Sequence, residues 1–344
     1  MKRNEFLDYT KGILISLVVI GHVIQNVAYQ NNYAIFFDDP FFKLIYIFHM
    51  PLFMAISGYL SFNTINKSKF STITVSKTRS YIVPIFVLSI ALTAARVVLK
   101  EEFVIENFLS TYLKVSLNAL WFLWVLWACI LILVGIKRIN ARKTRLLSLF
   151  LIAIITFATL FILPEISHVD MLQYMLPFFI SGYLFSSREV SFMRLLKHPF
   201  LRFLPAIVSI LIYALWSTDT YIYTTGMSLE SSNLPNILLR YVGGFSLSIM
   251  FLQLFHILFN YTPKFYCDHI KNWGSDSIYI YILQTYFFVI AAKVSHSFLP
   301  MIENALISLV MSLSIGIPVT ALCWLIGSYI SKNKLLALLL FGKQ

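Results

Sequence analysis

The sequence predicts an all-α, polytopic membrane protein with about ten transmembrane helices and with both termini in the cytoplasm. Three observations lead to this fold class. Of the 344 residues, 59% are hydrophobic and only 12% are charged, whereas charged residues make up about a quarter of an average soluble domain. Apolar runs of about 20 residues, long enough to cross a bilayer as a helix, recur along the chain. No series of segments alternates with period two, so a transmembrane β-barrel is not expected.

Ten segments are apolar enough to serve as spans, and the loops between them are short. We therefore expect a single membrane-embedded domain over residues 1–344. The first apolar run is not followed by a small-residue cleavage site, so it is expected to be retained as a span. The sixth span is short and contains Pro177. The predicted spans are residues 12–29, 41–62, 80–99, 115–136, 146–163, 171–186, 200–217, 236–259, 276–294 and 304–330.

The net charge of +12 follows from membrane topology, and no nucleic-acid partner is expected. With the N-terminus in the cytoplasm, most basic residues fall in cytoplasmic segments, as the positive-inside rule requires. The acidic residues lean to the outer side. This bias favours an even number of spans in a cell (inner or plasma) membrane. The six of the 27 basic residues assigned to the outer side are Lys43, Arg96, Lys100, Lys114, Arg240 and Lys293.

The first span carries a polar stripe. Lys11 and His22 are eleven positions apart, which is about 20° more than three helical turns, so the two side chains share a face. They are separated by roughly 16 Å along the helix axis. A polar stripe within a membrane must face protein or a water-filled cavity, because lipid does not solvate it.

The second span places another histidine at a similar depth. It runs in the opposite direction to the first, and His49 lies about eight residues from its outer end. Pro51 is expected to kink the helix beside His49. A neutral imidazole is suited to act as a general base near neutral pH. Interhelical hydrogen bonding and the lining of a translocation path are the alternatives. Two histidines without a third ligand make a poor zinc site, so no metal is expected.

Six short motifs accompany these residues along the chain. Together and in this order, they resemble the acyltransferase-3 family of integral membrane acyltransferases, most closely its fucose 4-O-acetylase-like branch. The resemblance covers most of the chain. The motifs are DYTKGI at 8–13, FHMPLF at 48–53, SGY at 57–59, WFL at 121–123, PFFISGY at 177–183 and GSDSIYIYIL at 274–283.

The resemblance implies a helical domain around a tunnel for the acyl donor, acetyl-CoA or another acyl-CoA, which enters from the cytoplasm. The acyl group would pass to a hydroxyl of a surface or lipid-linked carbohydrate. Lys11, helped by Lys77 or Arg79, would hold the phosphates of CoA. His22 would be the catalytic base, and His49 would orient it or relay its proton.

The chain departs from the family pattern at three positions. Lysine stands at Lys11 where arginine is usual, and this keeps the charge but loses the bidentate fork. Ser80 occupies a position where arginine is common. Gln284 replaces a late histidine, and an amide does not relay protons near neutral pH. A transporter or flippase for a lipid-linked saccharide is the alternative function. Arg240 is expected to reach headgroups or an acidic glycan.

Overall fold

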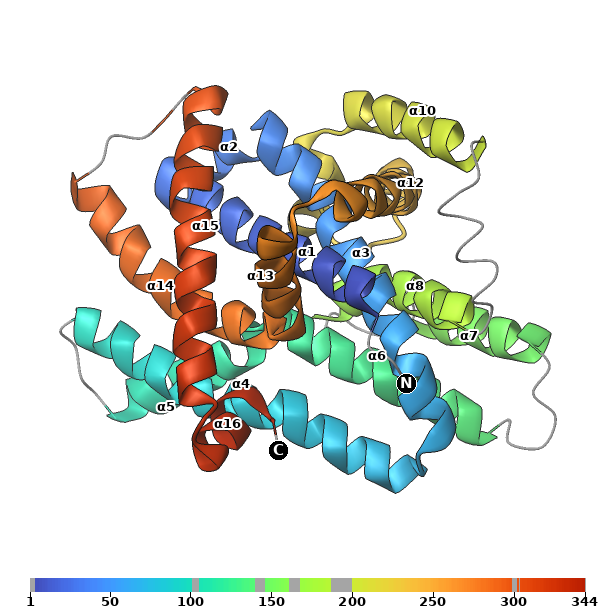
Figure 1. The fold of residues 1–344 in the computed structure, drawn as a ribbon, viewed down its shortest axis with the longest axis horizontal. Helices are drawn as coiled ribbons and strands as arrows, with labels where there is room; N and C mark the ends of the chain where they lie inside the picture. The colour runs from blue at the N-terminus through green and yellow to red at the C-terminus, as the bar shows by residue number, and fades with distance from the viewer. Residues whose placement is uncertain are drawn as a thin grey trace. The chain divides into compact units, whose positions relative to one another are not determined.

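The protein is all-α in its described part, as the sequence predicts. The computed structural model describes residues 4–100, 105–139, 146–160, 168–186, 200–298, 302 and 304–343, and no strand occurs among them. Figure 1 shows the helices. In chain order the elements are α1 (Glu5–Val23), η1 (Ile24–Ala28), α2 (Tyr33–Phe36), α3 (Pro40–Lys67), α4 (Phe70–Lys100), α5 (Ile105–Asn118), α6 (Trp121–Ile139), α7 (Leu146–Leu160), α8 (Val169–Ser186), α10 (Phe200–Leu215), η2 (Thr218–Thr220), α11 (Ile222–Thr225), α12 (Leu234–Tyr261), α13 (Lys264–Ser275), α14 (Ser277–Phe298), α15 (Ala305–Ile330) and α16 (Lys334–Phe341).

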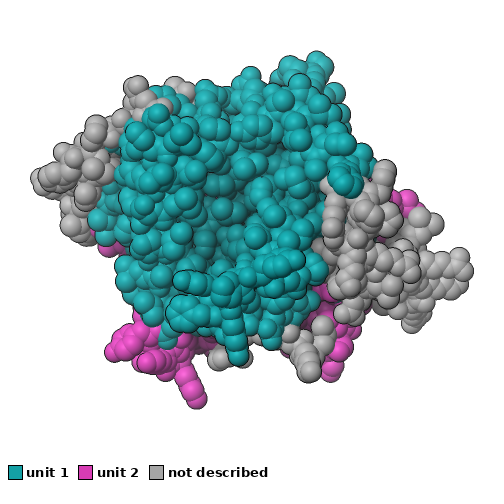
Figure 2. Space-filling model, turned by 45° about the horizontal axis from the view of Figure 1, so that its top comes forward, with its two compact units in different colours: residues 1–56, 184–328 teal, residues 57–183, 329–344 magenta. Residues whose placement is uncertain are grey.

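The chain divides into two compact units, which Figure 2 distinguishes by colour. Unit 1 contains residues 1–56 and 184–328, and unit 2 contains residues 57–183 and 329–344. The surface of unit 1 is hollowed near the centre of the face drawn in Figure 2. That both units form a single domain over 1–344 stays a prediction.

Among the described residues, five helices are long and apolar enough to cross a membrane. They are Glu5–Ala28, Pro40–Lys67, Phe70–Ala94, Leu234–Tyr261 and Ala305–Ile330. All five overlap predicted spans. Phe203–Leu215 and Ser277–Ala291 are shorter apolar helices at two further predicted spans. The end of predicted span 146–163 lies outside the described residues. The total of ten spans and the side on which the termini lie stay predictions.

The predicted span 115–136 is divided between two helices. Phe108–Asn118 and Trp121–Lys137 meet at an angle of 58°. Leu120, between them, has a φ of 55°, in the left-handed region that side chains rarely adopt. The Trp124 indole bridges the bend by donating to the Ser116 carbonyl oxygen at 3.0 Å. Hydropathy does not register a bend of this kind, because both helices are apolar.

In unit 2, the apolar C-terminal segment forms a separate capped helix, α16. The Asn333 side chain accepts from the backbone N–H groups of Leu335 and Leu336, and Gly342 adopts the left-handed conformation that ends a helix. The Ser80 hydroxyl, on α4, donates to the Gly342 carbonyl oxygen at 3.1 Å. This helix is therefore held against α4 through Ser80.

In unit 1, α13 crosses α1 at backbone contact (Figure 1). A Cβ atom at Gly12 would collide with the carbonyl group of Ile270, and one at Gly274 with the carbonyl group of Asp8. Glycines at a helix crossing allow this approach because they have no side chain. The segment between predicted spans 236–259 and 276–294 thus contains a helix, α13, which is fixed to the predicted cytoplasmic end of α1.

Candidate functional site

Helix α1 carries His22 at its C-terminal end. Two glycines allow close packing here: a Cβ at Gly21 would lie 2.8 Å from the Tyr46 ring, and a Cβ at Gly316 would lie 2.9 Å from the Ile20 side chain. Immediately after α1 the chain forms the π-helix η1, an irregularity that is frequent at functional sites. The Asn26 side chain donates to the His22 carbonyl oxygen at 2.8 Å, which satisfies an acceptor at this irregular turn.

Helix α3 fixes the orientation of His49. The side chain is 3% exposed, and its Nδ1 lies 2.7 Å from the Ile45 carbonyl oxygen. A carbonyl only accepts, so Nδ1 carries the proton in this contact and Nε2 of the neutral ring keeps its lone pair. Next to it, Phe48 stacks on Phe251 of α12 with ring centroids 3.8 Å apart. The imidazole is therefore held in one tautomer on a firmly packed helix.

The structure brings the two histidines together in unit 1. The Tyr46 ring packs against Gly21 of α1 and lies 4.8 Å from the His49 ring, measured between centroids. His22 and His49 are close enough to interact electrostatically. The half-buried His22 and the buried His49, which come from different helices, are thus near neighbours, and a charge on one disfavours a charge on the other. The catalytic role of each stays a prediction.

Gln284 of α14 is a third polar group at this place. The Phe288 ring, one turn further along α14, meets the His22 ring edge-on at 5.5 Å. Gln284 shares that helix face, and its amide approaches the His22 imidazole. No hydrogen bond of ordinary geometry is completed, and Gln284 is fully buried. From the sequence, Gln284 is visible only as a departure from the pattern that the chain resembles. Its incomplete hydrogen bonding is not visible there, because a glutamine in a helix usually finds a partner.

Lys11 lies on α1, half-buried, next to the crossing with α13. At the start of the same helix, Asn4 caps α1 by accepting from the Leu7 N–H group. Lys11 therefore lies on a rigid helix whose first turns are held by α13. Its contact with phosphate stays a prediction.

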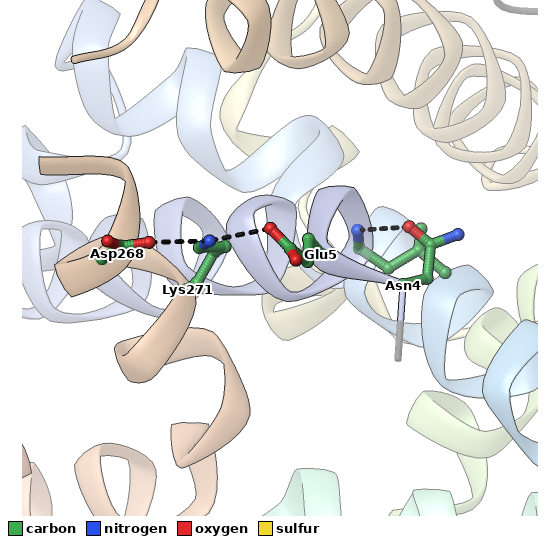
Figure 3. Close-up of polar contacts among 5 residues, drawn as sticks. Asn4, Glu5, Asp268 and Lys271 are labelled. Atoms are coloured by element: carbon green, nitrogen blue, oxygen red, sulfur yellow. Dashed lines mark hydrogen bonds and ion pairs between the residues drawn. The ribbon is translucent and has the colours of Figure 1, made fainter. Parts of the chain in front are cut away.

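An ion-paired lysine ties α13 to the beginning of α1. Lys271 Nζ lies 2.7 Å from Asp268 and 2.8 Å from Glu5, as Figure 3 shows. The hydrogen bonds with Asp268 and with Glu5 raise the pKa of Lys271 above its usual value. Lys271 thus stays charged through the physiological range, although this exposed pair of contacts adds little stability.

Lys77 and Arg79 belong to unit 2, on α4. Arg79 is exposed, and Lys77 Nζ lies 5.6 Å from the centroid of the Tyr81 ring. The structure therefore groups Lys11, His22 and His49 in one unit and these two cations in the other.

The arrangement in unit 1 offers imidazoles that can accept a proton and a buried amide that can donate a hydrogen bond. Within the described part of the chain, no group of three or more His, Cys, Asp or Glu side chains is placed to hold a metal ion. The chemistry that these residues offer is proton transfer and hydrogen bonding.

Comparison with known proteins places the chain among acyltransferases. A family model described as an acyltransferase domain, of the acyltransferase-3 type, matches residues 4–328. The nodulation protein NolL of Sinorhizobium fredii is 31% identical over 259 residues, which cover 74% of this chain and 69% of that protein. NolL of Mesorhizobium japonicum is 29% identical over 256 residues, or 73% of this chain and 67% of that protein. No solved structure matches.

Proposed function

Since the chain belongs to the acyltransferase-3 family of membrane acyltransferases, we propose that it moves an acetyl group from cytoplasmic acetyl-CoA to a carbohydrate hydroxyl. The acceptor is a surface or lipid-linked glycan, and the enzyme resides in the cell membrane. The observation that carries this proposal is that His22 and His49, from two helices of unit 1, are near enough to interact electrostatically, with the Tyr46 ring packed against Gly21 and beside the His49 ring. Family membership favours this enzyme over a saccharide transporter, which the polar stripe alone leaves open.

His22 is the general base in this reaction. It accepts the proton of the acceptor hydroxyl while the hydroxyl oxygen forms a bond to the acyl carbon. The carbon–sulfur bond then breaks, and His22 returns the proton to the departing thiolate, so free CoA and an ester are the products. A neutral imidazole suits both steps because it can accept and then donate.

His49 supports the base. Its Nδ1 donates to the Ile45 carbonyl oxygen, so Nε2 is the ring atom available for the proton exchanged with substrate or with His22. The electrostatic contact between the two rings makes their simultaneous protonation unfavourable.

The basic residues hold the acyl donor. Lys11 would bind a phosphate of CoA near the predicted cytoplasmic end of α1, and Lys77 or Arg79 would contribute from α4. A lysine provides a point charge for phosphate without the two-pronged contact of arginine. The stripe from Lys11 to His22 then leads from the phosphates to the reacting thioester.

The first experiment replaces His22 with alanine. Cells that express the wild-type protein are expected to carry ester-linked acetyl groups on their surface glycan, measured by mass spectrometry after mild alkaline release. His22→Ala is expected to lower transfer by a factor of about 10² to 10⁴, the usual contribution of a general base. Wild-type acetylation by His22→Ala at normal protein level contradicts the assignment.

A histidine of unit 1 outside the pair, His256, provides the matched control. The His256 ring, on α12, packs edge-on against Phe6 with centroids 5.2 Å apart. His256→Ala removes the same side chain from a membrane helix without touching the pair, so glycan acetylation is expected to persist. Acetyl-CoA hydrolysis or transfer by the purified wild-type protein tests the reaction itself; its absence with every glycan fraction of the host rejects the proposed function.

A further inference from the structure

Gln284 is a buried amide that lies beside the His22 imidazole and completes no hydrogen bond of ordinary geometry. Its side chain is 0% exposed, and neither Nε2 nor Oε1 has a hydrogen-bond partner. An amide taken out of water and left unpaired is costly, and native structures rarely keep one without a reason. The reasons available are a bound water, a ligand or a catalytic role.

The position of Gln284 favours a ligand at the candidate site. It lies on the face of α14 that also carries Phe288, whose ring contacts His22, and α14 packs against both α1 and η1. Gln173 on α8 is also buried and also has an unpaired Oε1, but it has an interaction partner, whereas both polar atoms of Gln284 lack a hydrogen bond. The unpaired amide is thus at the histidine pair.

We propose that Gln284 is a catalytic residue whose Nε2–H group donates to the carbonyl oxygen of the acyl group. This inference rests on the proposed function, because it assigns the amide to the acyl transfer itself. The Oε1 atom accepts from the N–H of His22 and leaves the other ring nitrogen free to act as the base. Both unsatisfied atoms of the side chain then have partners during the reaction.

The chemistry explains why a donor is needed there. When the acceptor oxygen bonds to the acyl carbon, the electron pair of the C=O bond moves onto the carbonyl oxygen. That oxygen bears a negative charge until the carbon–sulfur bond breaks and the double bond reforms. A fixed donor in a water-poor site stabilises this charge more than it stabilises the neutral thioester. The amide therefore affects the rate of transfer more than the binding of acetyl-CoA.

Gln284→Met tests the proposal because methionine has a similar size and no donor. With purified protein, acetyl-CoA and the host's de-acetylated glycan, kcat is expected to fall about 10²- to 10³-fold, the usual loss for one oxyanion donor. The KM for acetyl-CoA is expected to stay within about threefold. The melting temperature is expected to hold or rise, since an unpaired buried amide is removed. Gln284→His, which restores an N–H donor, is expected to recover much of the lost kcat.

Gln173→Met is the matched control, with unchanged kcat and a lower melting temperature expected because its partner is lost. A wild-type kcat for Gln284→Met overturns the proposal. A raised KM for acetyl-CoA with a normal kcat also overturns it, because Gln284 would then contribute only to the binding of acetyl-CoA. A lowered melting temperature with normal turnover per folded molecule indicates an amide paired with water, and this also overturns it. Each of these outcomes requires an active wild-type enzyme, so they are distinct from failure of the proposed function.

Discussion

Arg240 shows how strongly a single side chain organises unit 1. It is 1% exposed, and its guanidinium group donates to the backbone carbonyl oxygens of Asp219, Thr220, Tyr221 and Gly226. The sequence predicts a contact with headgroups or glycan at this position. The structure instead uses the charge to gather the segment between α10 and α12, because five N–H donors match several carbonyls at once.

Replacing Arg240 therefore tests a structural role. Arg240→Met leaves buried carbonyls without donors and is expected to lower the free energy of unfolding by about 3 kcal/mol, since each unpaired buried acceptor costs about 1–3 kcal/mol and water will satisfy some. Arg240→Lys keeps the charge with fewer donors, and its free energy of unfolding is expected to lie between those of the wild type and Arg240→Met. Thermal unfolding in detergent measures both. Equal stability of Arg240→Met and wild type would contradict this role.

The sequence reveals residues at this scale only when they stand out from their surroundings. His22 and His49 do, because an imidazole inside an apolar run has few ordinary explanations. Gln284 and Arg240 also draw notice, but the sequence does not reveal their roles, because these depend on the groups around them in the fold. Gln284 lacks a hydrogen bond of ordinary geometry, and Arg240 binds backbone carbonyls 14 to 21 positions earlier in the chain. Neither situation leaves a pattern in the sequence.

At the scale of elements, the crossing of α1 and α13 decides where Lys11 lies. The sequence predicts α1 from its apolar run, but α13 is short, amphipathic and hidden in a segment assigned to a loop. Gly12 and Gly274 meet backbone atoms of the opposite helix, and no rule of hydropathy pairs two glycines 262 positions apart. The bend near Leu120 escapes prediction for a similar reason, since a backbone angle changes there and the hydropathy does not.

Gly12→Ala is expected to disrupt this crossing. The new methyl group would collide with the Ile270 carbonyl group, and backbone gives way less readily than a side chain. Overpacking of this kind costs about 1–3 kcal/mol, so a lower melting temperature and reduced acyl transfer are expected. Gly135→Ala is the control: nothing lies within 4 Å of its Cβ position, and alanine stabilises a helix by about 0.5–1 kcal/mol relative to glycine. If the two variants have the same melting temperature, the contact is not tight.

At the scale of the whole molecule, hydropathy predicts the fold class, and charge predicts the orientation in the membrane. Hydropathy identifies the all-α membrane class because apolar helices of bilayer length are hard to explain otherwise. It also indicates segments such as 200–217 and 276–294, whose described apolar helices, Phe203–Leu215 and Ser277–Ala291, are shorter than a full span. Only the charges predict the orientation, because lysine and arginine are concentrated in the loops on the cytoplasmic side, whereas the hydropathy of a span is the same in either orientation.

The predicted orientation in the membrane can be tested by the accessibility of single cysteines from each side. With Cys129, Cys267 and Cys323 replaced, we expect Glu230→Cys, in an exposed outer segment, to react with a membrane-impermeant maleimide in intact cells. Lys332→Cys, exposed before α16, is expected to react only after permeabilisation. The physical reason is the excess of lysine and arginine in the segments assigned to the cytoplasm. Labelling of both positions from outside requires an even number of spans between them instead of the predicted three, and this would place Lys11 and the C-terminus on opposite faces.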